Sequence, residues 1–311
     1  MRRCRQSAAD HVVGRSFASS RSLDPTAMKV TPLLAVAAWL ALCPDQAFCG
    51  DPVIDANVKA DQVQHLYIEP VNPAHRAMYD RLKQLRVLER LSEFLSPLRL
   101  PRPLTLKVQG CDGRVNSYYW DDSVIVCYEY LDLLLKSAPQ ETKSGELTRH
   151  DALVGMTVDV FLHETGHAVF DMLQVPFLGR EEDAADQFAT YIELQFAKDD
   201  ARRLILGVAF LGHEQAEQQL ARPAQEREFA DVHGLPAQRY FNVICMAYGA
   251  DPDLYNDAIS RGHLPPARAK NCSYEYRRFA LGFRQLIEPY IDPILLNRVK
   301  AQKWFSFDAV N

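Results

Sequence analysis

One pentapeptide, HETGH at residues 163–167, constrains this chain of 311 residues more than any other feature. Because an α-helix turns by about 100° per residue, the imidazoles of His163 and His167 lie on one face, one turn apart. On such a helix both rings can reach one ion, with Glu164 projecting beside them. Two ligands do not make a metal site, and a pair of buried core histidines is the alternative, so a third ligand must come from elsewhere.

A second segment, GREEDAADQFAT at residues 179–190, provides acidic side chains with suitable spacing. Glu182 and Asp186 are four residues apart and share a helix face. Glu182 can complete a His-His-Glu set, and Asp186 can accept a hydrogen bond from the far nitrogen of a ligand histidine. Glu181 or Asp183 could replace Glu182 as the ligand, and an acidic helix N-terminus without a metal is the plainest alternative.

The first fifty residues differ in composition from the rest of the chain. Residues 1–27 are rich in Arg and Ser and lack apolar periodicity, whereas 28–50 begin with a basic residue, Lys29, before an apolar run over 33–43. Such a run is too short to span a bilayer and is typical of a signal peptide. We expect residues 1–27 to be an over-extended N-terminus that precedes the true start at Met28, with an organelle transit peptide as the alternative. We also expect cleavage near residue 50 and an exported protein, periplasmic or secreted, without a stable membrane span.

Four cysteines remain after the expected cleavage, namely Cys111, Cys127, Cys245 and Cys272. An even number of cysteines in an exported chain predicts two disulfides, although four inert buried thiols are the alternative. Of the three possible pairings, Cys111 with Cys127 and Cys245 with Cys272 is favoured because the members of each pair are close in sequence.

Residues 51–311 form a single predicted domain with two lobes. With 48% hydrophobic and 24% charged residues, the chain has the composition of a globular protein with a sizeable core. Apolar and polar residues alternate in parts of the first lobe, about 51–150, which predicts a small sheet. They recur at helical spacing in the second, helix-rich lobe, about 151–311. The predicted fold class is therefore α+β.

The sheet lobe begins with a loose or partly extended segment over 51–73. A helix is predicted over 74–95, where leucines recur at helical spacing. Two strand regions follow, at 104–111 and 115–131, with residues 121–122 as the turn of a hairpin.

Helical spacing dominates from residue 151 onward. Thr148 and Asp151 can form a capping box at the start of the helix that carries HETGH, and Pro176 lies beyond its end. The predicted helices are 151–173, one from about 182, 203–220, 236–248 and 274–290.

The charge of the chain argues against a nucleic-acid partner. The formal net charge is -5, the basic residues are scattered, and no aromatic and basic stripe is present to stack on bases. The partner that we expect instead is a peptide or protein substrate.

The two metal-ligand motifs resemble those of a known group of enzymes. HETGH followed by a helix with EDAAD is similar to the gluzincin metallopeptidases, and Glu-x-x-Ala-Asp looks like the membrane-associated CAAX-protease and heat-shock peptidase branch. That branch has membrane spans that this sequence lacks. NSYYWDDSVIVCYEYL, residues 116–131, is similar to the edge strand of thermolysin-like enzymes.

A bacterial metallopeptidase family, classed as a domain of unknown function, provides the best resemblance. It covers most of the chain after residue 50. The segments that carry it are CYEYL, FLHETGHAVFD, LGREEDAADQFA and DVHGLPAQRYFNVICMAYG.

The resemblance implies a zincin-like fold, in which a small mixed sheet with an edge strand lies over the HExxH active-site helix. It implies that one zinc ion per chain is held by His163, His167 and Glu182. Glu164 would then be the general base for a metal-activated water and Asp186 the hydrogen-bond partner of a ligand. Asn116 would bind the substrate backbone, although by itself it reads as a turn residue beside Gly113.

A donor that stabilises the oxyanion is also implied by the resemblance. His233 is the candidate, oriented by Asp231, while a surface histidine is the alternative and Tyr240 and Tyr119 are rival donors. A substrate peptide is expected to lie along the 123–127 strand.

Together these features predict an exported zinc-dependent peptidase. The alternatives are a non-catalytic exported protein that binds zinc or peptides, and a zinc hydrolase that acts on a non-peptide amide.

Overall fold

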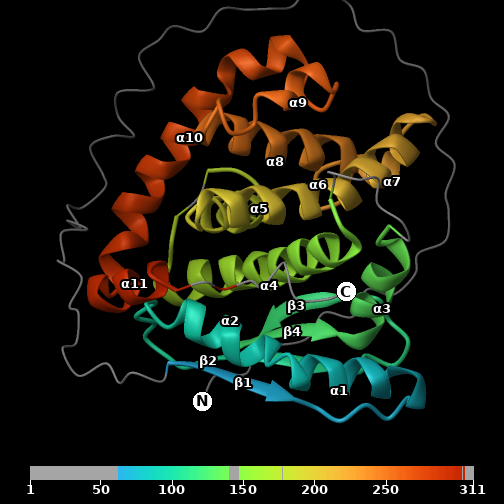
Figure 1. The fold of residues 1–311 in the computed structure, drawn as a ribbon, viewed down its shortest axis with the longest axis vertical. Helices are drawn as coiled ribbons and strands as arrows, with labels where there is room; N and C mark the ends of the chain where they lie inside the picture. The colour runs from blue at the N-terminus through green and yellow to red at the C-terminus, as the bar shows by residue number, and fades with distance from the viewer. Residues whose placement is uncertain (1–61, 140–146, 177, 303, 305–311) are drawn as a thin grey trace, which may run out of the picture. The chain divides into compact units, whose positions relative to one another are not determined.

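A four-stranded sheet and a long helix that lies on it organise the part of the chain that positions the metal-ligand motifs (Figure 1). The computed structural model describes residues 62–139, 147–176, 178–302 and 304, all of which belong to one unit, Ile54–Asn311. The predicted N-terminal extension and signal peptide, residues 1–50, lie outside the described residues. The α+β fold class predicted from the sequence is confirmed.

The sheet is mixed, with strand order β1-β2-β4-β3. β1 (Val63–Tyr67) pairs in parallel with β2 (Leu104–Gln109), and β2 pairs in parallel with β4 (Ser123–Cys127). β3 (Ser117–Trp120) is antiparallel to β4. The predicted hairpin turn at residues 121–122 is confirmed, and both aspartates have positive φ, 49° and 55°, as a two-residue turn of matching twist requires.

The prediction that a substrate peptide lies along residues 123–127 is wrong. This segment is β4, which is paired with β2 on one side and β3 on the other, so its backbone groups are already hydrogen-bonded. The edge strand next to the HETGH helix is β3. The strand predicted to run on to residue 131 also ends early, because α3 (Tyr128–Ser137) begins directly after β4.

The helix predicted over 74–95 is broken into two. A 3₁₀ turn (Pro73–His75) leads into α1 (Arg76–Gln84), and α2 (Val87–Leu95) follows after Arg86, whose φ of 54° is left-handed. The break turns the apolar face of α2 onto β1 and β2, where it is buried.

The HETGH motif lies on α4 (Arg149–Leu173), the longest helix among the described residues. The predicted capping box is confirmed, because the Thr148 hydroxyl accepts a hydrogen bond from the Asp151 backbone N–H and the Asp151 carboxylate accepts one from the Thr148 backbone N–H. Figure 1 shows α4 between the sheet and the helices of the C-terminal half, and it contacts β3 and β4 on one side. Most side chains of α4 are buried because the helix is covered on both sides.

Further helices cover α4 on the side away from the sheet. The helices predicted after residue 180 are all present, with longer bounds than predicted. Four short helices in the same part of the chain were not predicted. The long ones are α5 (Glu181–Glu193), α6 (Lys198–Leu220), α8 (Pro236–Ala250) and α10 (Pro266–Leu286). The short ones are α7 (Glu226–Phe229), α9 (Asp257–Ser260), η2 (Glu288–Tyr290) and α11 (Pro293–Lys300).

Close contact between α4 and α5 depends on small residues. A Cβ atom at Gly166, inside the HETGH motif, would lie 3.3 Å from the Ala185 Cα atom of α5. Ala185 and Ala189 are completely buried at this contact. The first turn of α5 is therefore close enough for its carboxylates to reach the two histidines of α4.

Both favoured disulfides are confirmed. Cys111 is bonded to Cys127 and Cys245 to Cys272. The first joins the ends of β2 and β4, and the second ties α8 to α10. As for membrane association, none of the helices within the described residues is both long and apolar enough to cross a bilayer.

Candidate metal centre

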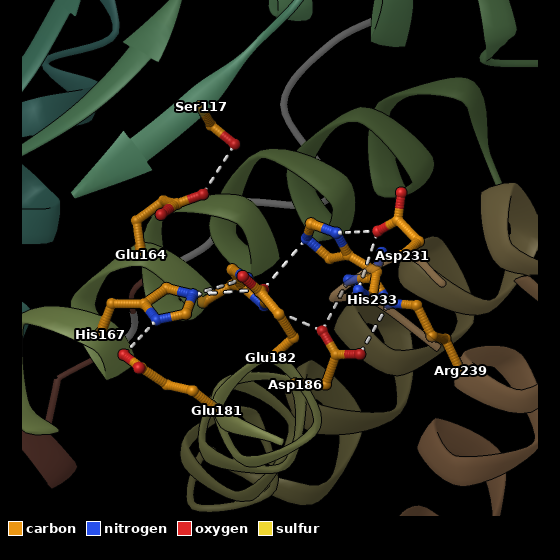
Figure 2. A network of polar contacts seen from close by, with 10 residues as sticks. Ser117, Glu164, His167, Glu181, Glu182, Asp186, Asp231, His233 and Arg239 are labelled. Carbon is orange, nitrogen blue, oxygen red and sulfur yellow. Dashed lines mark hydrogen bonds and ion pairs between the residues drawn. The ribbon is translucent and has the colours of Figure 1, made fainter. Parts of the chain in front are cut away.

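Three ligand atoms from α4 and α5 converge in the space between the two helices (Figure 2). The Nε2 atoms of His163 and His167 are 3.2 Å apart. The Oε2 atom of Glu182 lies 3.1 Å from the first nitrogen and 3.3 Å from the second. The predicted set of two imidazoles and one carboxylate is thus brought together as a nearly equilateral triangle.

This triangle has the size that a tetrahedral zinc ion requires. Zinc lies about 2.0–2.2 Å from nitrogen and oxygen ligands, so two ligands at a tetrahedral angle are about 3.3 Å apart. The separations of 3.1–3.3 Å match this value without any rearrangement of the helices. Three protein ligands would leave the fourth position of a tetrahedral zinc ion to water or substrate. The residues therefore fit zinc.

Asp186 fixes the orientation of the His163 ring. Its Oδ1 atom lies 2.8 Å from His163 Nδ1, the nitrogen that faces away from the other two ligand atoms. Arg239 of α8 holds the same carboxylate by two hydrogen bonds of 2.7 Å, donated by Nε and an Nη atom. The carboxylate is thus held between two helices, as a group that orients a ligand must be.

Glu181 plays the corresponding part for His167. Its Oε1 atom lies 2.8 Å from His167 Nδ1, so it contacts the back of the ring. Asp183, the other rival for the ligand position, forms an ion pair with Arg180. Glu182 alone of these three acids reaches the triangle.

His233 lies beside the triangle but is not part of it. Its Nε2 atom is 3.0 Å from Glu182 Oε2, and its Nδ1 atom is 3.1 Å from Asp231 Oδ1, which also accepts the His233 backbone N–H. Two groups of candidate ligands among the described residues have atoms that all lie within 4.8 Å of one another, and the one at this centre contains His163, His167 and Glu182 but not His233. The other group includes Cys111 and Cys127, which are joined in a disulfide.

The rival donors point elsewhere. The Tyr240 hydroxyl hydrogen-bonds the His263 ring at 2.7 Å, and the Tyr119 hydroxyl donates to Asp171 at 2.9 Å. Of the three candidates, His233 is the one that contacts a predicted metal ligand.

Glu164 projects toward the sheet rather than toward the histidines. Its Oε1 atom accepts a hydrogen bond of 2.8 Å from the Ser117 hydroxyl, which belongs to the edge strand β3 (Figure 2). The side chain is buried, with 5% of Glu164 exposed. Asn116 precedes β3, is exposed, and uses its backbone carbonyl to accept a hydrogen bond from Cys127 N–H.

Hydrogen bonds to the carboxylates raise the pKa values of the imidazoles at the centre and so favour their protonated forms. Burial acts to lower the pKa of His163, but hydrogen bonds to Asp186 and Glu182 outweigh it and raise the pKa to about 10. Hydrogen bonds from the imidazoles, His163 first, hold the pKa of Glu182 far below its usual range. Burial acts to raise the pKa of Asp186, yet the Arg239 guanidinium and then His163 lower it. A divalent cation would take the place of these protons.

Two hollows flank the centre. One, of about 410 Å³, is lined by Asp186, His233 and Arg239 among others. The other, of about 740 Å³, is lined by His167, Glu181 and residues of β3 and the turn after it. If a substrate bond were held at the metal, the substrate groups on its two sides could therefore each occupy one of these hollows.

Two imidazoles and one carboxylate presented by adjacent helices are the donor set that metal-dependent hydrolases use, and they define the class of this candidate site. The chain belongs to the DUF4344 family, described as "Putative metallopeptidase", whose model matches residues 67–287. The predicted membership of a metallopeptidase family of unknown function is confirmed. Such a family implies a metal and a peptide substrate. Searches of curated proteins and of solved structures return no match to the chain.

Three residues of the site were not singled out from the sequence, namely Ser117, Arg239 and, as a ring-orienting group, Glu181. Ser117 directly follows Asn116, and Arg239 lies in the segment AQRYF of a motif that carried the family resemblance. Neither position has a spacing relation to HETGH, because the fold alone brings β3 to α4 and α8 to α5.

Proposed function

We propose that this protein is an exported zinc-dependent peptidase that hydrolyses peptide bonds, with His163, His167 and Glu182 holding one zinc ion per chain. The observation that carries the proposal is the triangle of three ligand atoms separated by 3.1–3.3 Å, with a buried glutamate next in sequence to one of the histidines. A fold of the zincin type, with β3 as the edge strand over α4, is part of the proposal.

When bound, zinc would lower the pKa of a coordinated water to about 7 and polarise the scissile carbonyl. Glu164 takes the proton of the attacking water and passes it to the departing amine nitrogen. The hydrogen bond from Ser117 holds the Glu164 carboxylate in place, at 2.8 Å, between α4 and β3. Asp186 keeps the His163 ring oriented for binding through its other nitrogen.

His233 stabilises the negative charge that develops on the carbonyl oxygen. Its ring is partly exposed and lines the hollow of about 410 Å³, so a substrate can reach it. The Asp231 carboxylate, 3.1 Å from Nδ1, orients the ring. A donor beside the ligand triangle can interact with a substrate oxygen without occupying a metal position.

A substrate peptide adds to the free edge of β3. Within the described part of the chain β3 is paired on one side only, and its Ser117 side chain contacts Glu164. An edge strand offers backbone hydrogen bonds to an extended peptide, which would then lie near the centre. Asn116, at the start of the strand, contributes a side chain to backbone binding.

Export is supported by the two disulfides, since such bonds form and persist in oxidising compartments. Residues 28–50 would act as the signal peptide, with cleavage near residue 50.

The test is digestion of a mixed peptide library by the oxidised, zinc-loaded protein, alongside Glu164→Gln. A matched control is Glu217→Gln, which makes the same change at an exposed position of α6. We expect cleavage by the wild type and by Glu217→Gln, loss of cleavage with chelator, and no cleavage by Glu164→Gln although it binds zinc. Cleavage that survives in Glu164→Gln would refute the role of this residue. An intact library with zinc bound would favour the non-catalytic binding protein or a hydrolase of non-peptide amides.

A further inference from the structure

The hollow of about 410 Å³ beside the candidate metal centre contains an acidic residue that the proposed chemistry does not use. Asp159 lies on α4 one turn before His163, so it faces the same side of the helix. The hollow shares Asp186 and His233 with the centre, and a group bound in it would therefore be next to the reacting bond.

The other charged side chains of this hollow have partners. Asp186 is held by Arg239 through two hydrogen bonds of 2.7 Å, and Asp231 contacts His233 at 3.1 Å. Glu228, at the rim, forms an ion pair with Arg222 at 2.6 Å.

Asp159 is different, since no hydrogen bond or ion pair joins it to any part of the chain that the structure describes. The positive groups that act on it through space are His163 and then Arg239, and both are already hydrogen-bonded to Asp186. Asp159 thus lines the hollow without a cation in contact with its carboxylate among the described residues.

A second carboxyl group behind Asp159 adds no charge. Glu193 of α5 is completely buried, and neither of its oxygens has a hydrogen-bond partner among the described residues. Burial raises the pKa of Glu193 well above its usual range, and burial together with the charge of Asp186 raises the pKa of Asp159 to about 6, so Asp159 is the carboxyl group of the two that ionises first. The negative charge of this pair of carboxyl groups is therefore that of Asp159, which lines the hollow.

Apolar side chains form part of the wall of the hollow. They suit the alkyl stem of a long side chain, and the lining includes Met156, Val208, Leu211 and Val243. A lining that combines apolar side chains with the Asp159 carboxylate suits a ligand that has an aliphatic stem and a cationic end.

We propose that this hollow binds a positively charged group of the substrate, with the Asp159 carboxylate as its counter-ion. Two sources share this chemistry, a Lys or Arg side chain beside the scissile bond and the α-ammonium group of a peptide N-terminus. This inference rests on the proposed function, because the hollow adjoins the bond that would be cleaved. It adds the class of substrate that the centre accepts.

The test uses two mixed peptide libraries, one with free and one with acetylated N-termini, digested by the zinc-loaded protein. Enrichment of Lys and Arg at one position in both libraries identifies the side chain as the ligand. Cleavage confined to N-terminal residues and abolished by acetylation identifies the α-ammonium group. Either result supports the proposal, and cleavage without preference for a cation in either library overturns it.

Asp159→Asn removes the charge while keeping the shape of the side chain. We expect it to reduce the preference for a cationic peptide over its acetyl-lysine or N-acetylated counterpart by about 10- to 100-fold, the usual effect of a hydrogen bond to a charged group. The matched control is Asp171→Asn, one turn beyond His167 on the same helix but lining the other hollow. The control should keep the preference. An equal loss in both variants, or none in Asp159→Asn, would contradict a direct contact.

Binding separates this proposal from the proposed function. The zinc-loaded Glu164→Gln variant is titrated with a lysine peptide and with the same peptide carrying acetyl-lysine, and then with the free and N-acetylated forms of a neutral peptide. At least tenfold tighter binding of a cationic form, lost in Asp159→Asn, supports the hollow even if the wild type cleaves nothing. Equal binding in both pairs refutes it even if the wild type is an active peptidase.

Discussion

Asp186 on α5 places its Oδ1 atom 2.8 Å from Nδ1 of His163 on α4, so that the opposite nitrogen of the ring faces Glu182 and His167. The carboxylate cannot turn away, because Arg239 of α8 binds it with two hydrogen bonds of 2.7 Å. Three helices thus determine which nitrogen of His163 is available to a metal ion.

Asp186→Asn should therefore weaken zinc binding by about 10- to 100-fold while leaving the three ligands in place. The amide is a poorer acceptor and also releases Arg239. Zinc affinity is measured by competition with a chromogenic chelator. Asp183→Asn is the control, because Asp183 lies on the same helix and pairs with Arg180 outside the triangle. Equal affinities for the Asp186 and Asp183 variants would show that the 2.8 Å contact has no influence on the metal.

His233→Ala should lower kcat by about 10²- to 10³-fold and leave zinc affinity close to that of the wild type. The ring contacts Glu182 at 3.0 Å but lies outside the cluster of three ligand atoms. Steady-state kinetics and a zinc titration on the same preparation separate the two effects. A loss of zinc affinity as large as that of His163→Ala would instead make His233 a ligand.

Zinc binding should release protons at neutral pH. In the metal-free centre hydrogen bonds raise the pKa of His163 to about 10, against the effect of burial, and the pKa of His167 is also raised. A protonated imidazole cannot bind zinc, so the apparent affinity should rise with pH up to that pKa, by about tenfold per pH unit for each proton released. Calorimetry in buffers of different ionisation enthalpy counts the protons. An affinity that is the same at about pH 5.5 and pH 8 would contradict imidazole ligands.

Loss of the Cys245–Cys272 disulfide should lower the free energy of unfolding by about 3.5 kcal/mol, the chain-entropy value for a closed loop of this length. The two cysteines are 27 positions apart and tie α8, which carries Arg239, to α10. The double variant Cys245→Ser with Cys272→Ser is compared with the wild type by denaturant unfolding. We expect the ligand triangle of α4 and α5 to persist, so zinc should still bind. An unchanged unfolding midpoint would refute this stabilising role.

The sequence was most informative where one element decides the geometry. The capping box at Thr148 and the spacing of HETGH are local, and both predicted the α4 helix with its two histidines on one face. Glu182 and Asp186 were also found by spacing, because a second short-range helix pattern follows directly. The favoured disulfides joined cysteines that are close in sequence.

Features that depend on long-range packing were missed. No local pattern shows that β4 lies inside the sheet and β3 at its edge, because strand order is decided by how β1 and β2 add to the hairpin. Arg239 reaches Asp186 across 53 positions, and Ser117 reaches Glu164 across 47. The apolar periodicity of residues 74–95 is continuous and does not reveal the break at Arg86. The direction of α2 after the break depends on its contact with the sheet, which is not a local feature.

The central claim is that His163, His167 and Glu182 hold a zinc ion, and a crystal structure of the zinc-loaded protein tests it most directly, with diffraction recorded on both sides of the zinc absorption edge. The account predicts one anomalous peak about 2.0–2.2 Å from the Nε2 atoms of both histidines and from a carboxylate oxygen of Glu182. An absent peak, or one centred elsewhere with these three atoms free, would contradict it.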